Sequence, residues 1–439
     1  MNTATNRWET ARALLTRRRL ALLTQVAGLQ AGVQALGLLA GLLLVRTLEP
    51  AQYALLTLSL SAAAVATVLG DLGLSSAVTA LAGRDDHQRA GARRRWQALL
   101  TEASTLQRRL FVLVALVVGP GCALLLWQQQ GSVTEMLALS AVALVLALLQ
   151  VRVALDAALA RLAGQVAWQQ RLELRAAAGR LVVVALACAL FIDSLLALAT
   201  SLAAAAFTAL RLAQWRRGWV AADAPATADE APPPSRLSAL RHHLAQQGPN
   251  TLYYVVSSQF ALWLVAALGE RGAVADLGAL GRLAAVLALL SAVLTALAQP
   301  HFARLHRAAD LGASLVVVNV AFALLTALLT ALALAWPSAL LWLLGPHYMG
   351  LRAELPWLVL GSTLAAWSGA LYGLGCARGW VLPPAWVVGG GVGSTLLALL
   401  CFDVGSVGGA LQMTALVAFT SLLMTLVFLR QRLHAPGPA

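Results

Sequence analysis

The residues best suited to chemistry in this sequence are polar side chains inside one apolar stretch, residues 244–268. At 100° per residue they fall within an arc of about 140°, so a helix would carry them on one face. Amides, hydroxyls and aromatic rings around a watery cavity suit a ligand with many hydroxyls and apolar ring faces, such as a sugar. The alternative is hydrogen bonding between helices, worth about 0.6 to 2 kcal/mol per contact. These polar residues are Gln246, Gln247, Asn250, Tyr253, Tyr254, Ser257 and Ser258.

Two other apolar stretches carry weaker polar patterns. In residues 20–45 a narrow stripe at helical spacing consists of Gln30, Gln34, Gly37 and Gly41. In residues 356–376 the polar or aromatic candidates are Trp367, Ser368 and Tyr372. Each set is interpreted either as cavity lining or as packing between helices.

Arg180 is the most constrained charged residue. Only 12 uncharged residues separate it from Asp193, which is too few to span a bilayer. A membrane helix ending near Asp193 therefore holds Arg180 about 20 Å from its outer end. An arginine at that depth needs an anion, a partner or water. A diphosphate would be bound bidentately by the guanidinium; the alternative is an ion pair with Asp156 or Asp71.

The other intramembrane charges allow more than one interpretation. Arg152 and Asp156 have the i, i+4 spacing of a helical ion pair, and they lie either at the inner interface or in a cavity. Asp71 lies about 27 Å along its helix from Tyr53; it is a candidate for substrate binding, and the alternative is packing and interfacial solvation at the helix end. Arg46 and Arg282 are expected near outer helix ends, where they would extend to headgroups; Arg282 is also a candidate for binding a headgroup from the outer side.

The composition is that of an integral membrane protein. Hydrophobic residues make up 60% and charged residues 11% of the 439 residues, where a soluble domain has about 25% charged. All 31 basic residues are Arg, and they cluster between apolar runs, so the pI near 11.1 reflects membrane topology and not nucleic-acid binding. The four cysteines lie inside apolar runs without metal-ligand spacing, and no cofactor is expected.

Hydropathy predicts about twelve transmembrane helices. The most informative stretch, residues 41–84, contains a polar elbow, Arg46-Thr47-Leu48-Glu49-Pro50, between two of them. A break is expected inside the third helix at Gly119-Pro120-Gly121. The predicted helices cover residues 20–45, 53–82, 110–127, 135 to beyond 152, 174–192, 195–215, 244–268, 277–299, 315–336, 356–376, 382–402 and 407–429.

The distribution of arginine predicts the sidedness. Most of the arginines fall in loops on one side or within helices, and that side is expected to be cytoplasmic, with both termini on it. The exceptions, on the predicted outer side, are Arg46, Arg271, Arg282 and Arg352.

A repeated pattern indicates two halves. A long helix, a short outer turn, a long helix and a basic inner loop occur at residues 20–109 and again at 244–307, which predicts two pseudo-symmetric six-helix lobes around a central cavity. The expected division is a basic N-terminal segment 1–19, a first lobe 20–216, a cytoplasmic linker 217–243, a second lobe 244–430 and a cytoplasmic tail 431–439.

Several short motifs in the same order resemble one transporter family. The elbow reads as an Arg followed by Leu-x-Pro-x-x-Tyr, and Asp71-Leu72-Gly73-Leu74-Ser75 follows it. Later come Gln299-Pro300-His301-Phe302-Ala303-Arg304 and Leu344-Gly345-Pro346-His347-Tyr348, then a helix with Tyr372 and Gly375. This text resembles the polysaccharide (O-antigen type) flippases of the multidrug/oligosaccharidyl-lipid/polysaccharide exporter superfamily.

The resemblance implies a flippase of the bacterial inner membrane. Its expected partners are a polyprenyl-pyrophosphate-linked oligosaccharide, membrane lipids and polysaccharide polymerase machinery. The chain departs from the family at Ser257-Ser258-Gln259-Phe260-Ala261-Leu262, where many relatives carry an Asp, so ion coupling through that Asp is not expected. With no nucleotide-binding P-loop in the sequence, an ion gradient or the substrate gradient would supply the energy.

Three alternatives remain at this point. A multidrug exporter of the same superfamily is the nearest. A peptidoglycan-precursor flippase is disfavoured because its relatives tend to carry two more helices than this chain can hold. A polytopic glycan polymerase or glycosyltransferase would need catalytic acids in sizeable outer loops, and the expected outer loops are short and poor in acids.

Overall fold

The computed structural model describes residues 17–82, 92–129, 132–221, 235–269, 272–287, 308–376, 380 and 382–434. These residues form helices joined by short links, and they contain no strand. The helices of the first half are α2 (Arg17–Thr47), α3 (Pro50–Asp71), α4 (Leu74–Ala82), α5 (Ala92–Gln128), α6 (Val133–Leu162), α7 (Val166–Leu190) and α8 (Ser194–Ala221).

The second half begins with α9 (Leu237–Leu268) and a helical segment at residues 273–287. A short helix and one 3₁₀ turn, α12 (Pro337–Trp342) and η1 (Pro346–Tyr348), interrupt the sequence of long helices. The remaining long helices are α11 (Ala308–Ala335), α13 (Leu355–Cys376), α14 (Pro384–Cys401) and α15 (Val407–His434).

Ten helices within the described ranges are long and apolar enough to cross a membrane. Helix α7 falls outside this set because it carries Arg171, Glu173, Arg175 and Arg180, yet it packs along α2. The helix at residues 273–287 leads into residues that the structure does not describe. The prediction of an all-α membrane protein with two six-helix lobes is confirmed.

Two helix predictions were wrong in detail. The predicted second helix, 53–82, is divided into α3 and α4 at Leu72 and Gly73, whose φ angles are 41° and 86°. Both values lie in the left-handed region, which ends a helix. The predicted break at Gly119-Pro120-Gly121 does not occur, because α5 continues through Pro120; helices within membranes tolerate proline when neighbouring groups satisfy the backbone.

The helices flanking the predicted linker 217–243 are longer than expected, since α8 extends to Ala221 and α9 begins at Leu237. Residues 222–234 lie outside the described part. So do the N-terminal residues 1–16, the end of the predicted eighth helix and the motif Gln299–Arg304. The division of the chain into domains stays a prediction.

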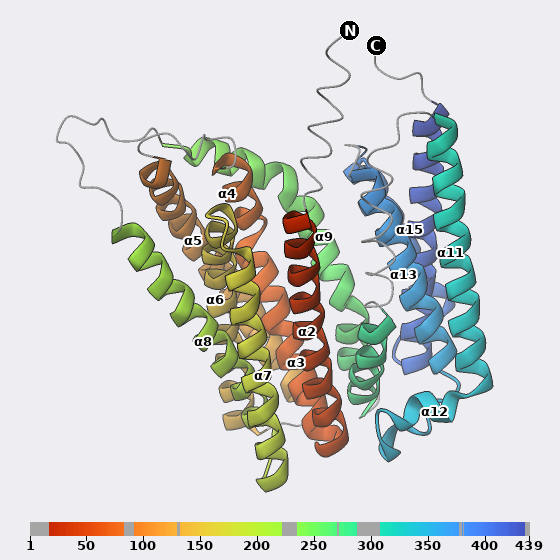
Figure 1. Cartoon of the computed structure of the whole chain (residues 1–439). Coiled ribbons are helices and arrows are strands. Elements are labelled where there is room, and N and C mark those ends of the chain that lie inside the picture. Colours follow the sequence, from red (N-terminus) through yellow and green to blue (C-terminus); the bar gives the residue numbers. More distant parts are fainter. Residues whose placement is uncertain are drawn as a thin grey trace, which may run out of the picture.

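The two halves form separate lobes that meet at one end (Figure 1). We call the end where α2 begins and α15 finishes the terminal side, and the opposite end the α12 side. On the α12 side one apolar core joins both halves; it includes Leu44 and Tyr53 of the first half and Val274, Leu341 and Leu355 of the second. Toward the terminal side, separate clusters pack within α4, α5 and α6 and within α11, α13 and α15.

Helix α9 bridges the two lobes. On the terminal side Leu240 and Leu244 join the apolar cluster of α4 and α5, and Arg236 donates a hydrogen bond to the Leu81 carbonyl at 3.1 Å. Further along, α9 packs on α14 and α15 of the second lobe. Pro249 lies inside the helix between these two regions; because proline removes a backbone hydrogen bond, this is where the helix bends most readily.

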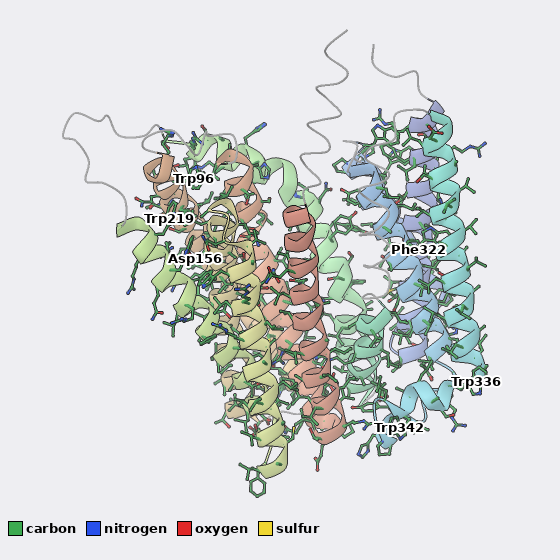
Figure 2. All side chains as sticks on the ribbon, in the orientation of Figure 1. Trp96, Asp156, Trp219, Phe322, Trp336 and Trp342 are labelled. Carbon is green, nitrogen blue, oxygen red and sulfur yellow. The ribbon has the colours of Figure 1, made fainter. Side chains whose placement is uncertain are left out.

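Aromatic side chains mark both ends of the molecule (Figure 2). Trp336 and Trp342 lie near α12 and are 63% and 66% exposed. Near the opposite end Trp96 stacks on Trp219, with ring centroids 6.1 Å apart. Tryptophan at both ends of a bundle is typical of the two membrane–water interfaces.

Candidate functional site

The α12 side is closed by a contact between the lobes. Arg46, at the end of α2, donates hydrogen bonds to the carbonyl oxygens of Trp342 and Leu343 in and after α12. Its guanidinium also lies over the Trp342 ring, 4.6 Å from the centroid. The sequence did not predict this contact, in which the side chain caps backbone carbonyls of the other lobe; the expected contact of Arg46 with headgroups stays a prediction.

Tyr348 completes this closure. The residue is 1% exposed and belongs to the core shared by both lobes. Burial raises the pKa of the Tyr348 phenol, and the neighbouring Tyr53 and Asp276 act in the same direction, so the hydroxyl stays protonated. Burial also leaves this hydroxyl without a hydrogen-bond partner among the described residues.

The side chain of Arg282 extends toward the first lobe. This corrects the expectation that Arg282 extends to headgroups at the membrane surface. Its Nε donates a hydrogen bond to the Tyr53 hydroxyl at 3.1 Å. Its side chain also packs on α2, where a Cβ added at Gly41 would lie 3.2 Å from Arg282 Cδ. A larger residue than glycine at position 41 would displace the arginine.

Arg180, on α7, lies close enough to Arg282 for the two guanidinium groups to repel each other. Its Nε is buried and has no hydrogen-bond acceptor among the described residues. The two predicted ion-pair partners are used elsewhere: Asp156 pairs with Arg216 at 2.8 Å, and Asp71 binds Ser75 and Gln107. The ion-pair alternative for Arg180 is therefore wrong among the described residues, where Arg180 is close enough to Arg282 for their charges to interact and forms no ion pair with a carboxylate.

The glutamine stripe of α2 continues from this point toward the terminal side. Gln30, Gln34, Gly37 and Gly41 share one face of the helix, and Gly41 faces Arg282 of the second lobe. Gln30 and Gln34 are exposed, which agrees with the separation of the lobes toward that side. The stripe therefore faces the space between the lobes.

Four of the predicted site residues line one cavity of about 310 Å³ in the second lobe. It lies among α9, α13, α14 and α15, and no charged side chain lines it. The rings of Tyr253 and Tyr254 meet edge to face at 5.6 Å. The predicted residues that line it are Tyr253, Tyr254, Ser257 and Tyr372, and Ser368 joins them.

Two other predicted residues of α9 do not line this cavity. Ser258 donates its hydroxyl to the Val255 carbonyl at 2.8 Å, within its own helix. Asn250 follows Pro249, and its Oδ1 is buried without a partner among the described residues. The side chains of Gln246 and Gln247 lie outside the described part. Trp367 packs between helices, where its Nε1 donates to Asn319 Oδ1 at 2.9 Å.

The remaining predicted charges have structural contacts. Asp71 accepts hydrogen bonds from the Ser75 hydroxyl at 2.7 Å and from Gln107 at 3.2 Å, and it thereby holds the start of α4 against α5. The predicted pair of Arg152 with Asp156 is replaced by Asp156 with Arg216 of α8. Figure 2 shows Asp156 within the first lobe, below Trp219. Arg152 and Asp156 line a separate cavity there.

The closeness of Gly391 to Tyr253 gives a first testable prediction. A Cβ at Gly391 would overlap the Tyr253 hydroxyl, whereas a Cβ at Gly393, two residues on, meets nothing within 4 Å. We expect Gly391→Ala to lower the free energy of unfolding by roughly 1 to 3 kcal/mol through overpacking. Gly393→Ala should leave it unchanged or raise it by up to about 1 kcal/mol through helix propensity.

Thermal unfolding of the two purified variants in detergent measures this difference. Equal melting temperatures for the two variants would show that Tyr253 does not fill the space over Gly391.

Sequence comparisons find no match, and structural comparisons find similar folds among solved structures. The sequence matches no protein-family model, and no curated protein sequence matches it. Among solved structures, the inward-facing conformation of a multidrug resistance MATE family transporter of the MOP superfamily gives a TM-score of 0.64 at 16% identity, over 91% of this chain and 94% of that chain. Lipid II flippase MurJ, in an inward closed conformation, gives 0.59 at 13% identity over 92% and 87%.

An outward-facing MATE transporter of the MOP superfamily gives a TM-score of 0.58 at 17% identity, over 92% of this chain and 93% of that chain. The chain therefore has the two-lobe fold of these transporters. At this level of identity the likeness shows the fold alone, and the polysaccharide flippase family stays a prediction.

Three features of the site could not be predicted from local sequence patterns. Arg216, the true partner of Asp156, lies on a helix whose place beside α6 is not encoded in any local pattern. The close contact of Tyr253 with Gly391 was indicated in the sequence only by the glycines around position 391. The contact of Arg46 with α12 joins residues almost 300 positions apart.

Proposed function

We propose that this protein flips a polyprenyl-pyrophosphate-linked oligosaccharide across the bacterial inner membrane. The observation that carries the proposal is that Arg180 lies within electrostatic reach of Arg282 and has no carboxylate partner among the described residues. Two guanidinium groups that repel each other are stabilised by a ligand with two negative charges, and a diphosphate supplies these in a geometry that arginine binds bidentately.

The neighbouring polar surfaces suit the glycan part of such a substrate. The exposed glutamines of α2 offer amide donors and acceptors on the terminal side of the arginine pair. The cavity beside α9 offers hydroxyls and tyrosine rings without any charge. Sugars combine hydroxyls with apolar ring faces, so uncharged polar and aromatic groups would bind them.

We assign the terminal side to the cytoplasm because arginines collect there. In this orientation the structure is closed toward the outside and its lobes separate toward the cytoplasm, as alternating access requires for loading. The released glycolipid would then pass to a polysaccharide polymerase. Described arginines near the terminal side include Arg95, Arg108, Arg109, Arg161, Arg216, Arg217, Arg241, Arg430 and Arg432; those near the α12 side are Arg46 and Arg352.

A multidrug exporter is the second candidate, and the aromatic lining by Tyr253, Tyr254 and Tyr372 favours it. Cationic drugs bind aromatic faces. They would also approach the two arginines, whose positive charges repel them, and the cavity offers no carboxylate to compensate. The flippase is therefore the better supported function.

Cells lacking the protein test the two functions against each other. We expect them to accumulate lipid-linked oligosaccharide in the cytoplasmic leaflet and to lose a surface or secreted polysaccharide, with unchanged sensitivity to cationic dyes. The measurement is glycolipid extraction combined with a dye-sensitivity assay, and re-expression of the intact chain is the control. Normal polysaccharide output together with new dye sensitivity would place the exporter first.

A further inference from the structure

A second cavity, of about 520 Å³, lies in the first lobe away from the arginine pair of the lobe interface. Residues of α5, α6 and α8 line it, and α6 packs on both α5 and α8. All of its lining residues belong to these three helices of one lobe. A ligand there would therefore remain bound to a single lobe whatever the other lobe does.

The cavity carries an excess of positive charge. Asp156 is its one carboxylate, and Arg216 already pairs with it at 2.8 Å. The other three arginines of the lining are Arg108, Arg152 and Arg217, and all three are exposed. Among the described residues none of the three has a hydrogen-bond or ion-pair acceptor, although Arg152 is attracted by Asp156. Three guanidinium groups are thus available to an anion.

These arginines lie at one depth. At the α-helical rise, Arg108, Arg152 and Arg217 are about 28 to 35 Å from the α12-side ends of their three helices. The hydrocarbon layer of a bilayer is about 30 Å thick. The charged end of the cavity therefore lies at the headgroup level of the leaflet on the terminal side.

The rest of the cavity is apolar and extends into the hydrocarbon level. Phe111 follows Arg108 by one turn toward the α12 side, and Leu148 precedes Arg152 by one turn in the same direction. Small residues of α8, Ala206 and Ala209, leave the space open between them. An anionic end at headgroup level and an apolar groove below it match the shape and chemistry of a phospholipid.

We propose that this cavity binds one anionic phospholipid from the leaflet on the terminal side. Arg108, Arg152 and Arg217 hold the phosphate, and one acyl chain lies along Ala206 and Ala209. Arginine binds phosphate oxygens bidentately. The positive charges of three arginines also repel the cationic group of a zwitterionic headgroup, so the site selects an anionic headgroup. The lipid is a resident ligand of the first lobe and is distinct from the cargo proposed at Arg180 and Arg282.

Native mass spectrometry of the full chain tests the site. The probes are phosphatidylglycerol and phosphatidylcholine with identical acyl chains, added to delipidated protein. We expect the intact chain to retain one phosphatidylglycerol with at least tenfold preference. The triple variant Arg108→Gln, Arg152→Gln, Arg217→Gln should lose this preference, and the corresponding three Arg→Lys substitutions should retain part of it.

A matched control removes three arginines from outside the cavity, with Arg161→Gln, Arg171→Gln and Arg175→Gln. It should retain phosphatidylglycerol like the intact chain. A separate variant, Ala209→Trp, fills the apolar groove without changing the charge and should lose the bound lipid. Size-exclusion chromatography confirms that each variant is folded.

Three results would overturn the proposal. They are equal retention of the two lipids by the intact chain, the same loss in both triple variants, and displacement of phosphatidylglycerol by an equimolar isoprenoid diphosphate. The last result would assign the cavity to the cargo. Since no glycolipid is present in the experiment, its outcome is independent of the proposed flipping activity.

Discussion

We expect the double variant Thr57→Cys with Gly278→Cys to stop transport when its disulfide forms and to recover on reduction. Thr57 lies on α3 of the first lobe, and Gly278 lies in the helix at residues 273–287 of the second. A Cβ built at Gly278 is 3.2 Å from Thr57 Cβ, close to the 3.5 to 4.5 Å of a disulfide, so a small shift allows the bond. Because this contact holds the α12 side closed, a covalent link there prevents release to the outside.

The measurement is movement of a fluorescent, short-chain polyprenyl-pyrophosphate oligosaccharide in vesicles, before and after a reductant. Cys122, Cys188, Cys376 and Cys401 are first replaced by Ala, so that only the new pair can form a disulfide.

A matched control places a disulfide inside one lobe, between Gly361→Cys and Ala415→Cys. A Cβ at Gly361 lies 3.5 Å from Ala415 Cβ, and both residues belong to the second lobe. This disulfide should form as readily and leave transport within about twofold of the reduced protein. Normal flipping by the oxidised 57–278 variant would show that the lobes do not separate on the α12 side during transport.

Hydropathy and arginine distribution were enough to predict most of the fold. The elbow at Leu48 and Glu49 was predicted because proline at the start of α3 and polar residues around it end one apolar run and begin the next. The break after Asp71 was missed because Leu72 is an ordinary apolar residue in the sequence, and its left-handed φ of 41° is rare for a leucine. Local sequence patterns predict where helices cross a membrane, but they predict breaks within those helices poorly.

The sequence was enough to predict which types of residue form the site, but it was not enough to predict which residues pair with each other. A polar face on one helix is a local signal, so Tyr253, Tyr254 and Ser257 could be assigned together before their cavity was seen. Ion pairs between helices depend on which helices are neighbours, and nothing in the sequence places α8 beside α6. Asp156 was therefore given the wrong partners. Because Asp156 pairs with Arg216, Arg180 has no acidic partner among the described residues.

Arg180→Gln is expected to reduce flipping at least tenfold without reducing the yield of folded protein. A buried charge without a partner normally costs stability, and here Arg282 adds repulsion. Replacing Arg180 by a neutral side chain of similar shape removes both costs, so the melting temperature should stay equal or rise. Transport should fall because the diphosphate loses one of its two guanidinium ligands. Opposite effects on stability and on activity identify a residue that the ligand, and not the fold, requires.

The experiment compares flipping per folded molecule and melting temperature in detergent for two variants of α7. Arg175→Gln is the control because Arg175 is exposed on the same helix, about 7.5 Å from Arg180 along the axis. It should change neither quantity by much. If Arg180 instead supports the fold through a partner, Arg180→Gln will lower the melting temperature and leave transport per molecule normal. That result would remove the arginine pair from the proposed substrate site, and with it the main argument for a diphosphate cargo.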